Sequence, residues 1–317
     1  MSLLMFWIKL KKAGKAALGQ GQQWGTTLLA LSGLLLGLMM CPAIAIASPL
    51  QSGIEAFNQQ DYPAAMQHFN QAIQQQDELD LAYGNRCLVY LLMDAPQQAT
   101  EDCTTALKLN PTHPLGRFYR GLARYRLTQY EGAIADFTRH LQQQPQDART
   151  YYNRGLAFFA QGATEQAITD YQQALAYAVP LNATPLNSME MSNLYNDLGV
   201  AYLVNAQLEQ AIVALDQAIA LDNQDPRAYF NRGCVCHRQG NYAAALKEFE
   251  RVLALDAHYA ETYLNRGIVK QQMGDLTGAI ADLETAIAHF QAQGDVNGVY
   301  RAKLRLHQLD QSQVAIG

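Results

Sequence analysis

Apolar residues between about residues 46 and 293 recur at the spacing of an α-helix and do not alternate as they would along a strand. Leucine, alanine, glutamine and glutamate dominate this stretch, and short turn signals such as Gln239-Gly240-Asn241 and Met273-Gly274-Asp275 interrupt it. The pattern predicts amphipathic helices that are paired by tight turns. Because one such pair cannot bury its apolar face alone, the pairs are expected to stack on one another.

The same stretch repeats itself with a period of 34 residues, and one of the steps is 44 residues long. Seven repeats align on a small residue, which we name the small column: Gly53, Cys87, Gly121, Gly155, Gly199, Gly233 and Gly267. Alanine follows the small column by twelve residues in all seven repeats, and a mostly aromatic or aliphatic residue follows it by sixteen. Glycine inside a helix costs about 1 kcal/mol relative to alanine. The small column is therefore expected where the first helix of a repeat crosses the alanine of the second.

This pattern resembles the tetratricopeptide repeat family, whose 34-residue unit has an aromatic residue four positions before the small residue. That aromatic residue is present as Tyr83, Tyr151, Tyr195, Tyr229 and Tyr263, and the closing proline of the unit is present as Pro111 and Pro145. Departures are Pro49, Arg117 and Cys87. The resemblance covers about residues 46–293. It implies an all-α, right-handed superhelical α-solenoid of seven stacked helix–turn–helix hairpins.

Five segments are expected along the chain. They are a leader (1–47), repeats one to four (48–179), an inserted connection (180–192), repeats five to seven (193–293) and a C-terminal capping helix with its tail (294–317). Ser48 followed by Pro49 is typical of a helix start. The capping helix is expected between Gly298 and Asp310 to bury an apolar stripe and to keep basic residues in solvent. The stripe is Val299, Ala302, Leu306 and Leu309, and the basic residues are Arg301, Lys303 and Arg305.

Five repeats carry an arginine directly before the small column, and the same five carry an acid fifteen residues after it. The pairs are Arg86 with Asp102, Arg120 with Asp136, Arg154 with Asp170, Arg232 with Glu248, and Arg266 with Asp282. The two repeats that lack the arginine, with Ser52 and Leu198 in its place, also lack the acid, with His68 and Ala214. This agreement predicts an ion pair between the two helices of one repeat, with a structural and not a catalytic role.

The family resemblance implies that the first helices line a concave groove that holds an extended or helical segment of another protein. Two residues before the small column stand Asn85, Asn153, Asn231 and Asn265, while Gln51, Tyr119 and Asp197 replace asparagine in the other repeats. An asparagine amide both donates and accepts hydrogen bonds, so this column suits a peptide backbone. The alternative is that these asparagines cap turns or bind the adjacent helix.

Apolar and basic side chains are expected in the same groove. The apolar candidates are Phe118, Tyr125, Tyr152, Phe159 and Phe230, and the basic candidates are Arg126, Arg149 and Arg227. They predict a partner segment with apolar anchors and some acidic residues. The alternative for each aromatic residue is that it packs between repeats.

The leader resembles an export signal. Lysines occur between residues 9 and 15, an apolar run follows from Thr26 to Met40, and Ala45 and Ala47 match a signal-peptidase site. We favour removal after Ala47, and an uncleaved membrane anchor is the alternative because the apolar stretch is long enough to span a bilayer. In both cases the bulk of the chain is expected outside the cytoplasm, in a periplasm or an equivalent lumen.

Charge and motifs narrow the function. With 23 basic and 28 acidic residues, the chain has a net charge of −5 and no overall basic field for nucleic acid. The sequence has no phosphate-binding loop and no nucleophile or metal motif, so no catalytic residue, metal or cofactor is expected. Cys234 and Cys236 are interpreted as core residues. Cys87 and Cys103 face each other as a disulfide or, as we favour, as two buried thiols.

These observations predict a non-catalytic, exported scaffold or adaptor that binds another protein. The alternative is a structural subunit of a membrane or cell-envelope assembly that is anchored by its N-terminal segment. No nucleic-acid partner is expected, and membrane contact is expected only through an uncleaved leader.

Overall fold

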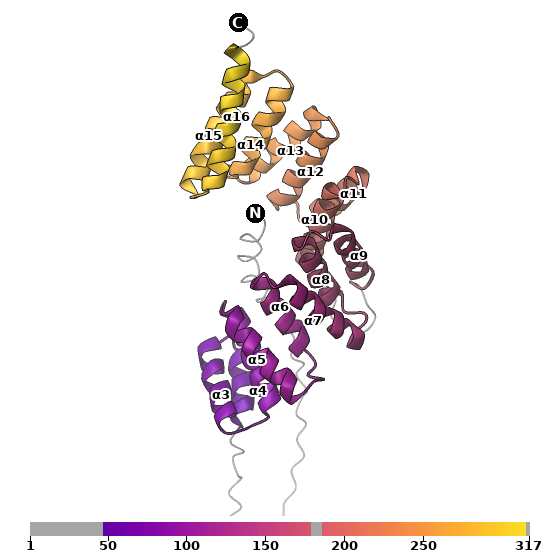
Figure 1. Cartoon of the computed structure of the whole chain (residues 1–317), viewed down its shortest axis with the longest axis vertical. Helices are drawn as coiled ribbons and strands as arrows, with labels where there is room; N and C mark the ends of the chain where they lie inside the picture. The colour runs from indigo at the N-terminus through magenta and orange to yellow at the C-terminus, as the bar shows by residue number, and fades with distance from the viewer. Residues whose placement is uncertain (1–46, 179–185, 315–317) are drawn as a thin grey trace, which may run out of the picture. The chain divides into compact units, whose positions relative to one another are not determined.

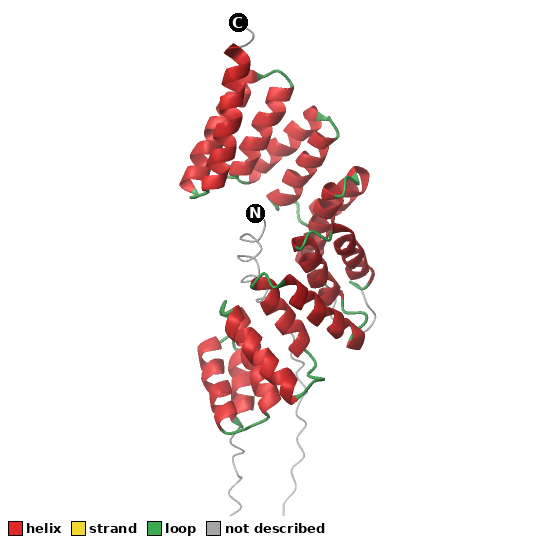
Figure 2. Cartoon of the chain, in the orientation of Figure 1, coloured by secondary structure: helices red, strands yellow, loops and turns green. Residues whose placement is uncertain are grey.

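The computed structural model describes residues 47–178 and 186–314, and within them it contains α-helices and no strand (Figure 2). The chain divides into two compact bodies, of which the first ends at Asp136 and the second begins at Phe137. Figure 1 shows the order of the helices along the chain. Each body is a stack of antiparallel helix pairs, so the all-α solenoid expected from the repeats is confirmed.

The first body contains α2 (Pro49–Asn58), α3 (Tyr62–Gln74), α4 (Leu79–Leu92), α5 (Pro96–Leu109) and α6 (Gly116–Arg126). Helix α7 (Tyr130–Gln143) contains the boundary. The second body contains α8 (Ala148–Ala160), α9 (Thr164–Ala176), α10 (Ser188–Val204), α11 (Leu208–Leu221), α12 (Pro226–Arg238), α13 (Tyr242–Leu255), α14 (Ala260–Gln272), α15 (Leu276–Ala292) and α16 (Val296–Val314). The even-numbered helices α2 to α14 carry the small column, and we name them helix A of repeats one to seven. The odd-numbered helices α3 to α15 carry the alanine column and are helix B.

The small column lies where helix A crosses helix B, and the bulky side chain of helix B fills the crossing. A Cβ atom placed on Gly155 would lie 2.6 Å from the ring of Tyr171 and 3.3 Å from the carbonyl oxygen of Ala167. Tyr171 and the equivalent Phe249 are fully buried. Glycine is therefore needed chiefly to admit the ring, and the alanine column contributes its backbone to the contact.

In repeat two a disulfide replaces the contact between glycine and ring at the helix crossing. Cys87 on α4 and Cys103 on α5 occupy the positions of the glycine and the ring, both are buried, and the Cα atoms are 5.5 Å apart. The sequence analysis favoured two thiols here. The structure instead joins them, because the crossing brings the two Cα atoms to a separation that a disulfide spans.

The two ends of the repeat array agree with most expectations. Helix α2 begins at Pro49, and the hydroxyl of Ser48 caps it by accepting a hydrogen bond from the backbone N–H of Gln51 at 3.3 Å. Helix α16 buries Ala302 and Leu309 against the last repeat, as expected. Its outer side is less polar than expected, because Val296, Tyr300 and Leu304 are 79%, 68% and 44% exposed.

We expect Gly155→Ala to lower the free energy of unfolding by about 1 kcal/mol or more, whereas Gly267→Ala should be nearly neutral. The first Cβ would lie 2.6 Å from the Tyr171 ring, and the second 3.2 Å from the nearest atoms of Leu283 and Ala279. Overpacking costs about 1–3 kcal/mol and outweighs a gain in helix propensity of about 1 kcal/mol in the first case only. Urea unfolding followed by circular dichroism measures both. A Gly155→Ala variant as stable as the wild type would contradict the crossing geometry.

Candidate functional site

An arginine–carboxylate pair joins helix A to helix B in five repeats, as the sequence predicts. In repeat four, Nε and Nη2 of Arg154 donate to the two carboxylate oxygens of Asp170 at 2.7 and 2.8 Å. The side chains are only 18% and 5% exposed. The other pairs are Arg86–Asp102, Arg120–Asp136, Arg232–Glu248 and Arg266–Asp282. A pair this well buried and bidentate is costly to break from one side only.

The guanidinium of Arg154 has further contacts that the sequence analysis missed. Its Nη1 donates to the hydroxyl of Thr138, in helix B of the preceding repeat, at 3.1 Å. The rings of Tyr151 and Phe158 lie 5.5 and 5.8 Å from its central carbon. We name this place the arginine seat. It is bounded by the acid, the two ring positions on helix A, and a polar side chain of the preceding helix B.

The third contact recurs in three other repeats, as Arg86–Asn70, Arg120–Thr104 and Arg232–Asp216. The preceding helix B contributes the residue seventeen positions after its own small column. That position is polar in repeats one to six: Asn70, Thr104, Thr138, Gln172, Asp216 and Glu250. This polar column is a signal in the sequence that the arginine also binds the preceding repeat.

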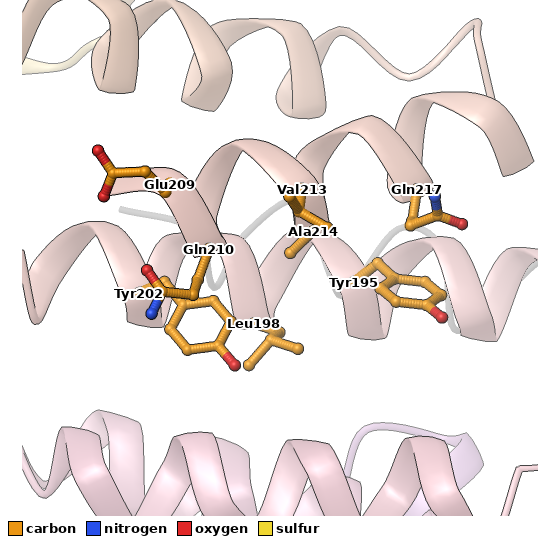
Figure 3. Close-up of a pocket in the computed structure, with 8 residues that line it drawn as sticks. All are labelled: Tyr195, Leu198, Tyr202, Glu209, Gln210, Val213, Ala214 and Gln217. Atoms are coloured by element: carbon orange, nitrogen blue, oxygen red, sulfur yellow. The ribbon is translucent and has the colours of Figure 1, made fainter. Parts of the chain in front are cut away.

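Repeat five has an empty arginine seat. Leu198 and Ala214 replace the arginine and the acid, and a pocket of about 320 Å³ opens between α10 and α11. Figure 3 shows Leu198 between Tyr195 and Tyr202 on one helix, with Val213 and Ala214 on the other. The lining is completed by Glu209, Gln210 and Gln217. This is a mostly apolar pocket with two tyrosine rings.

A chain of hydrogen bonds links the helices A of the second body. The hydroxyl of Tyr152 on α8 donates to Asp197 on α10 at 2.6 Å, and the Asn196 amide donates to the same carboxylate at 3.3 Å. Asn231 on α12 then donates to Asn196 at 2.8 Å. We name these four side chains the helix A network. They place a hydroxyl on α8, a carboxylate and an amide on α10, and an amide on α12, and Tyr152 and Asn196 are buried.

Burial sets the protonation of this network. It raises the pKa of Asp197 above its ordinary value, although the hydrogen bond from Tyr152 and the charge of Arg227 act in the opposite direction. Burial and the nearby Asp197 carboxylate raise the pKa of Tyr152 well above its ordinary value. Tyr152 therefore keeps its proton at neutral pH and acts as the donor to Asp197.

The three arginines expected to supply positive charge all have partners within the protein. Arg149 forms a two-pronged pair with Glu190 at 3.2 and 3.3 Å. Arg227 is buried against Asp225 and donates to Asn193. Arg126 donates to the carbonyl oxygen of Leu91 in the last turn of α4. Arg149 and Arg227 therefore add less net charge to a partner site than the sequence suggests, because carboxylates neutralise them.

The amides of the asparagine column form hydrogen bonds within the protein, and Asn231 bonds to an adjacent helix, which is one of the expected alternatives. The amides of Asn85, Asn153 and Asn265 donate to carbonyl oxygens four residues earlier in their own helices, at 2.7–2.8 Å. Asn231 belongs to the helix A network. One amide hydrogen of each is thus engaged, and each amide still has a second N–H and a carbonyl oxygen.

The aromatic candidates are held by neighbouring side chains. Tyr152 is 7% exposed, and the Phe230 ring lies 5.9 Å from Phe249 and 5.3 Å from Tyr259. The remaining three are partly buried: Phe118 beside Tyr119, Tyr125 beside Tyr130, and Phe159 against the core of repeats four and five.

Cys234 is inert in this setting, since burial raises the pKa of its thiol to about 12.

Asp197, Asn193, Asn196 and Glu190 were not among the predicted contact residues. Only Asp197 had a signal in the sequence, as the acid that interrupts the asparagine column. The other three lie on α10, the longest described helix A, which follows the insertion. The 34-residue alignment gives no guide to contacts from a segment that the other repeats lack.

Sequence profiles of the tetratricopeptide repeat (TPR) match the chain at residues 128–162, 148–178, 206–240, 226–259 and 260–288. The chain belongs to the tetratricopeptide repeat family. The matched segments lie within repeats three to seven.

Known TPR proteins match parts of this one. A TPR repeat-containing protein of Methanocaldococcus jannaschii is 22% identical over 65% of this chain and 36% of its own length. The Hsp70-Hsp90 organizing protein of Triticum aestivum is 30% identical over 30% of this chain and 16% of its own length. The chain thus spans well under half of these relatives. A crystal structure of a TPR protein from Parabacteroides merdae is 16% identical, with a TM-score of 0.59 over 80% of this chain and 97% of that chain. That likeness supports the fold.

The leader predicted at residues 1–47 lies, apart from Ala47, outside the described residues. Of the helices in residues 47–178 and 186–314, none combines the length and the apolar content that crossing a bilayer requires. Membrane anchoring and export therefore remain predictions from the sequence. Of the connection predicted at 180–192, residues 180–185 are also outside the described part, and helix α10 begins within its range, at Ser188.

We expect Asp170→Ala to lower the free energy of unfolding by about 3–5 kcal/mol in the wild type and by much less in an Arg154→Leu background. In the wild type the substitution leaves the guanidinium of Arg154 buried without its carboxylate. Urea unfolding of the four proteins gives the coupling free energy. Asp216→Ala is the control, because Asp216 is 48% exposed and its ion pair with Arg232 should contribute about 1 kcal/mol or less. Equal losses from Asp170→Ala in both backgrounds would disprove the coupling.

Proposed function

We propose that this TPR protein is a non-catalytic scaffold or adaptor that holds a segment of a partner protein against the helices A of its second body. The observation that supports this proposal is the helix A network. Asp197 and Asn231 are partly buried on the adjacent helices α10 and α12, the buried Asn196 links them, and Phe230 stands one residue before Asn231. A peptide backbone carries alternating donors and acceptors, so a row of amides can bind it without reading its sequence.

The chemistry of the partner follows from what the site retains. Arg149 and Arg227 are neutralised by Glu190 and Asp225, so a strongly acidic segment is not required. Partly exposed aromatic residues beside the network suit an apolar anchor. The Hsp70-Hsp90 organizing protein, which matches 30% of this chain, is by its name a protein that brings two others together. A binding role of that general kind is what we propose here.

We further propose that the protein works outside the cytoplasm, because the leader has the charge, the apolar run and the Ala45–Ala47 site of an export signal. A disulfide between Cys87 and Cys103 fits an oxidising compartment. It supports export independently of the leader.

A second candidate function is a structural subunit of a membrane or cell-envelope assembly that is anchored by the leader. The observation that favours it is the outer side of α16, where Val296, Tyr300 and Leu304 are exposed at successive turns. An apolar stripe of this kind is suited to contact with another subunit.

We expect the double substitution Asn153→Ala with Asn231→Ala to weaken partner binding at least tenfold, because it removes amides from two of the helices A. The partner is first captured from the native envelope with the wild-type protein and identified, and its binding segment is then titrated calorimetrically. The control is Gln143→Ala with Gln291→Ala, which removes two exposed amides from helices B. Unchanged affinity in the asparagine variant, with its fold intact by circular dichroism, would rule out the helix A face as the site.

Export predicts that the mature protein from native cells begins at Ser48. N-terminal sequencing of the protein in the periplasmic and membrane fractions measures this directly. Replacing Ala45 and Ala47 by leucine should block processing and leave a larger form in the membrane. An unprocessed wild-type protein in the membrane fraction would favour the anchored assembly subunit, and one in the cytosol would contradict export.

A further inference from the structure

Repeat five keeps the boundaries of the arginine seat and lacks only the arginine and its acid. Tyr195 and Tyr202 occupy the two ring positions, which are both aromatic in repeats two and four as well. Gln172 of helix α9 occupies the polar position of the preceding repeat, and its amide donates to the Tyr202 hydroxyl at 2.8 Å. Repeat one also lacks the arginine, but Pro49 and Ala56 stand at its ring positions, so it has no such seat.

The empty seat is a pocket of about 320 Å³, close to the smallest volumes typical of ligand sites. It suits a single side chain better than a cofactor. Leu198, Val213 and Ala214 provide an apolar floor and wall on which the methylene groups of a long side chain can pack (Figure 3). Val213, at the rim, is 63% exposed, so the pocket opens to solvent.

The rest of the lining favours a cation. The two tyrosine rings offer the same faces over which the guanidinium groups of Arg86 and Arg154 lie at 5.3–5.8 Å in repeats two and four. Glu209, Gln210 and Gln217 also line the pocket, and Figure 3 shows the Glu209 carboxylate and the Gln217 amide directed outward at its two ends, where their oxygens can accept hydrogen bonds from a cation entering from solvent. A planar guanidinium has five donors to match such a set.

The loss of the acid together with the arginine is also explained. An aspartate at position 214, which is buried, would be an uncompensated charge whenever the pocket was empty. Alanine allows the pocket to stay empty without that penalty. If the arginine seat binds a ligand from outside the protein, it should lose the arginine and the acid and keep the two rings. Repeat five has Leu198 and Ala214 in place of the charged pair and keeps Tyr195 and Tyr202.

We propose that this pocket binds an arginine side chain of a partner protein, which takes the place that an internal arginine fills in the other repeats. The pocket shares no residue with the helix A network. It is therefore a second, separate contact point, and its test does not depend on binding at the helix A face.

The test uses the full chain and Nα-acetyl-arginine amide as the probe. The methyl NMR signals of Val213 and Leu198 report on the pocket. We expect saturable shifts with the arginine probe and at least tenfold weaker binding of the matched citrulline and norleucine amides, which lack the charge. Absence of a saturable shift with the arginine probe would overturn the proposal. Equal or tighter binding of the norleucine probe would also overturn it, by showing an apolar pocket.

Two variants make the test specific. Ala214→Asp supplies the acid of the other repeats and should tighten binding of the arginine probe at least tenfold, while leaving the norleucine probe unimproved. Leu198→Arg with Ala214→Asp rebuilds the internal pair, should raise the melting temperature, and should abolish the shifts of Val213. The Gln143→Ala, Gln291→Ala protein, changed at two exposed positions on helices B outside the pocket, is the matched control and should bind the arginine probe normally. Unchanged probe binding in the rebuilt variant would show that the arginine seat is not the site.

Discussion

In four of the seven repeats, the buried arginine of helix A joins its own helix B to the helix B of the preceding repeat. A guanidinium has donors in one plane, and in repeat four they join α8 to two other helices: Asp170 on α9 accepts two hydrogen bonds, and Thr138 on α7 accepts the third. A desolvated charge is tolerated only when its donors are used and its counter-charge lies close. Because the acid belongs to the same repeat and the third acceptor to the preceding one, a single side chain fixes both the geometry of a hairpin and its position on its neighbour.

The glycine-to-ring crossing supplies the space for that arrangement. Tyr171 passes over Gly155 because no Cβ stands in its way, and helix A comes close enough for the residue before the glycine to reach helix B. Repeat two shows that the close approach matters more than the residues that make it. There the disulfide Cys87–Cys103 replaces the contact, and Arg86 still binds Asp102 at 2.6 and 2.8 Å.

The features that recur in each repeat could be predicted from the sequence. The period gave the hairpins, and the joint loss of arginine and acid in two repeats gave an ion pair that the structure contains in the other five. Contacts made by residues outside the repeat could not be found in this way. Glu190, which binds Arg149, lies in the first turn of α10 and within the segment 180–192 that the sequence predicted as an inserted connection. Arg149 was expected to add positive charge to the binding face, and its position in the repeat gave no sign of the carboxylate that α10 brings to it.

Departures from the repeat gather in repeat five. Its helix A is the longest of those described, at 17 residues, and it begins with a capping box between Asn187 and Glu190. Asp197 interrupts the asparagine column, and Leu198 beside it empties the arginine seat. Sequences that otherwise obey local rules tend to break them where function requires it. These two neighbouring residues of α10 contribute to different sites. Asp197 belongs to the helix A network with Tyr152, and Leu198 lines the pocket. Repeat five is therefore where a partner would be recognised from two sides, while the repeats around it keep the helices in register.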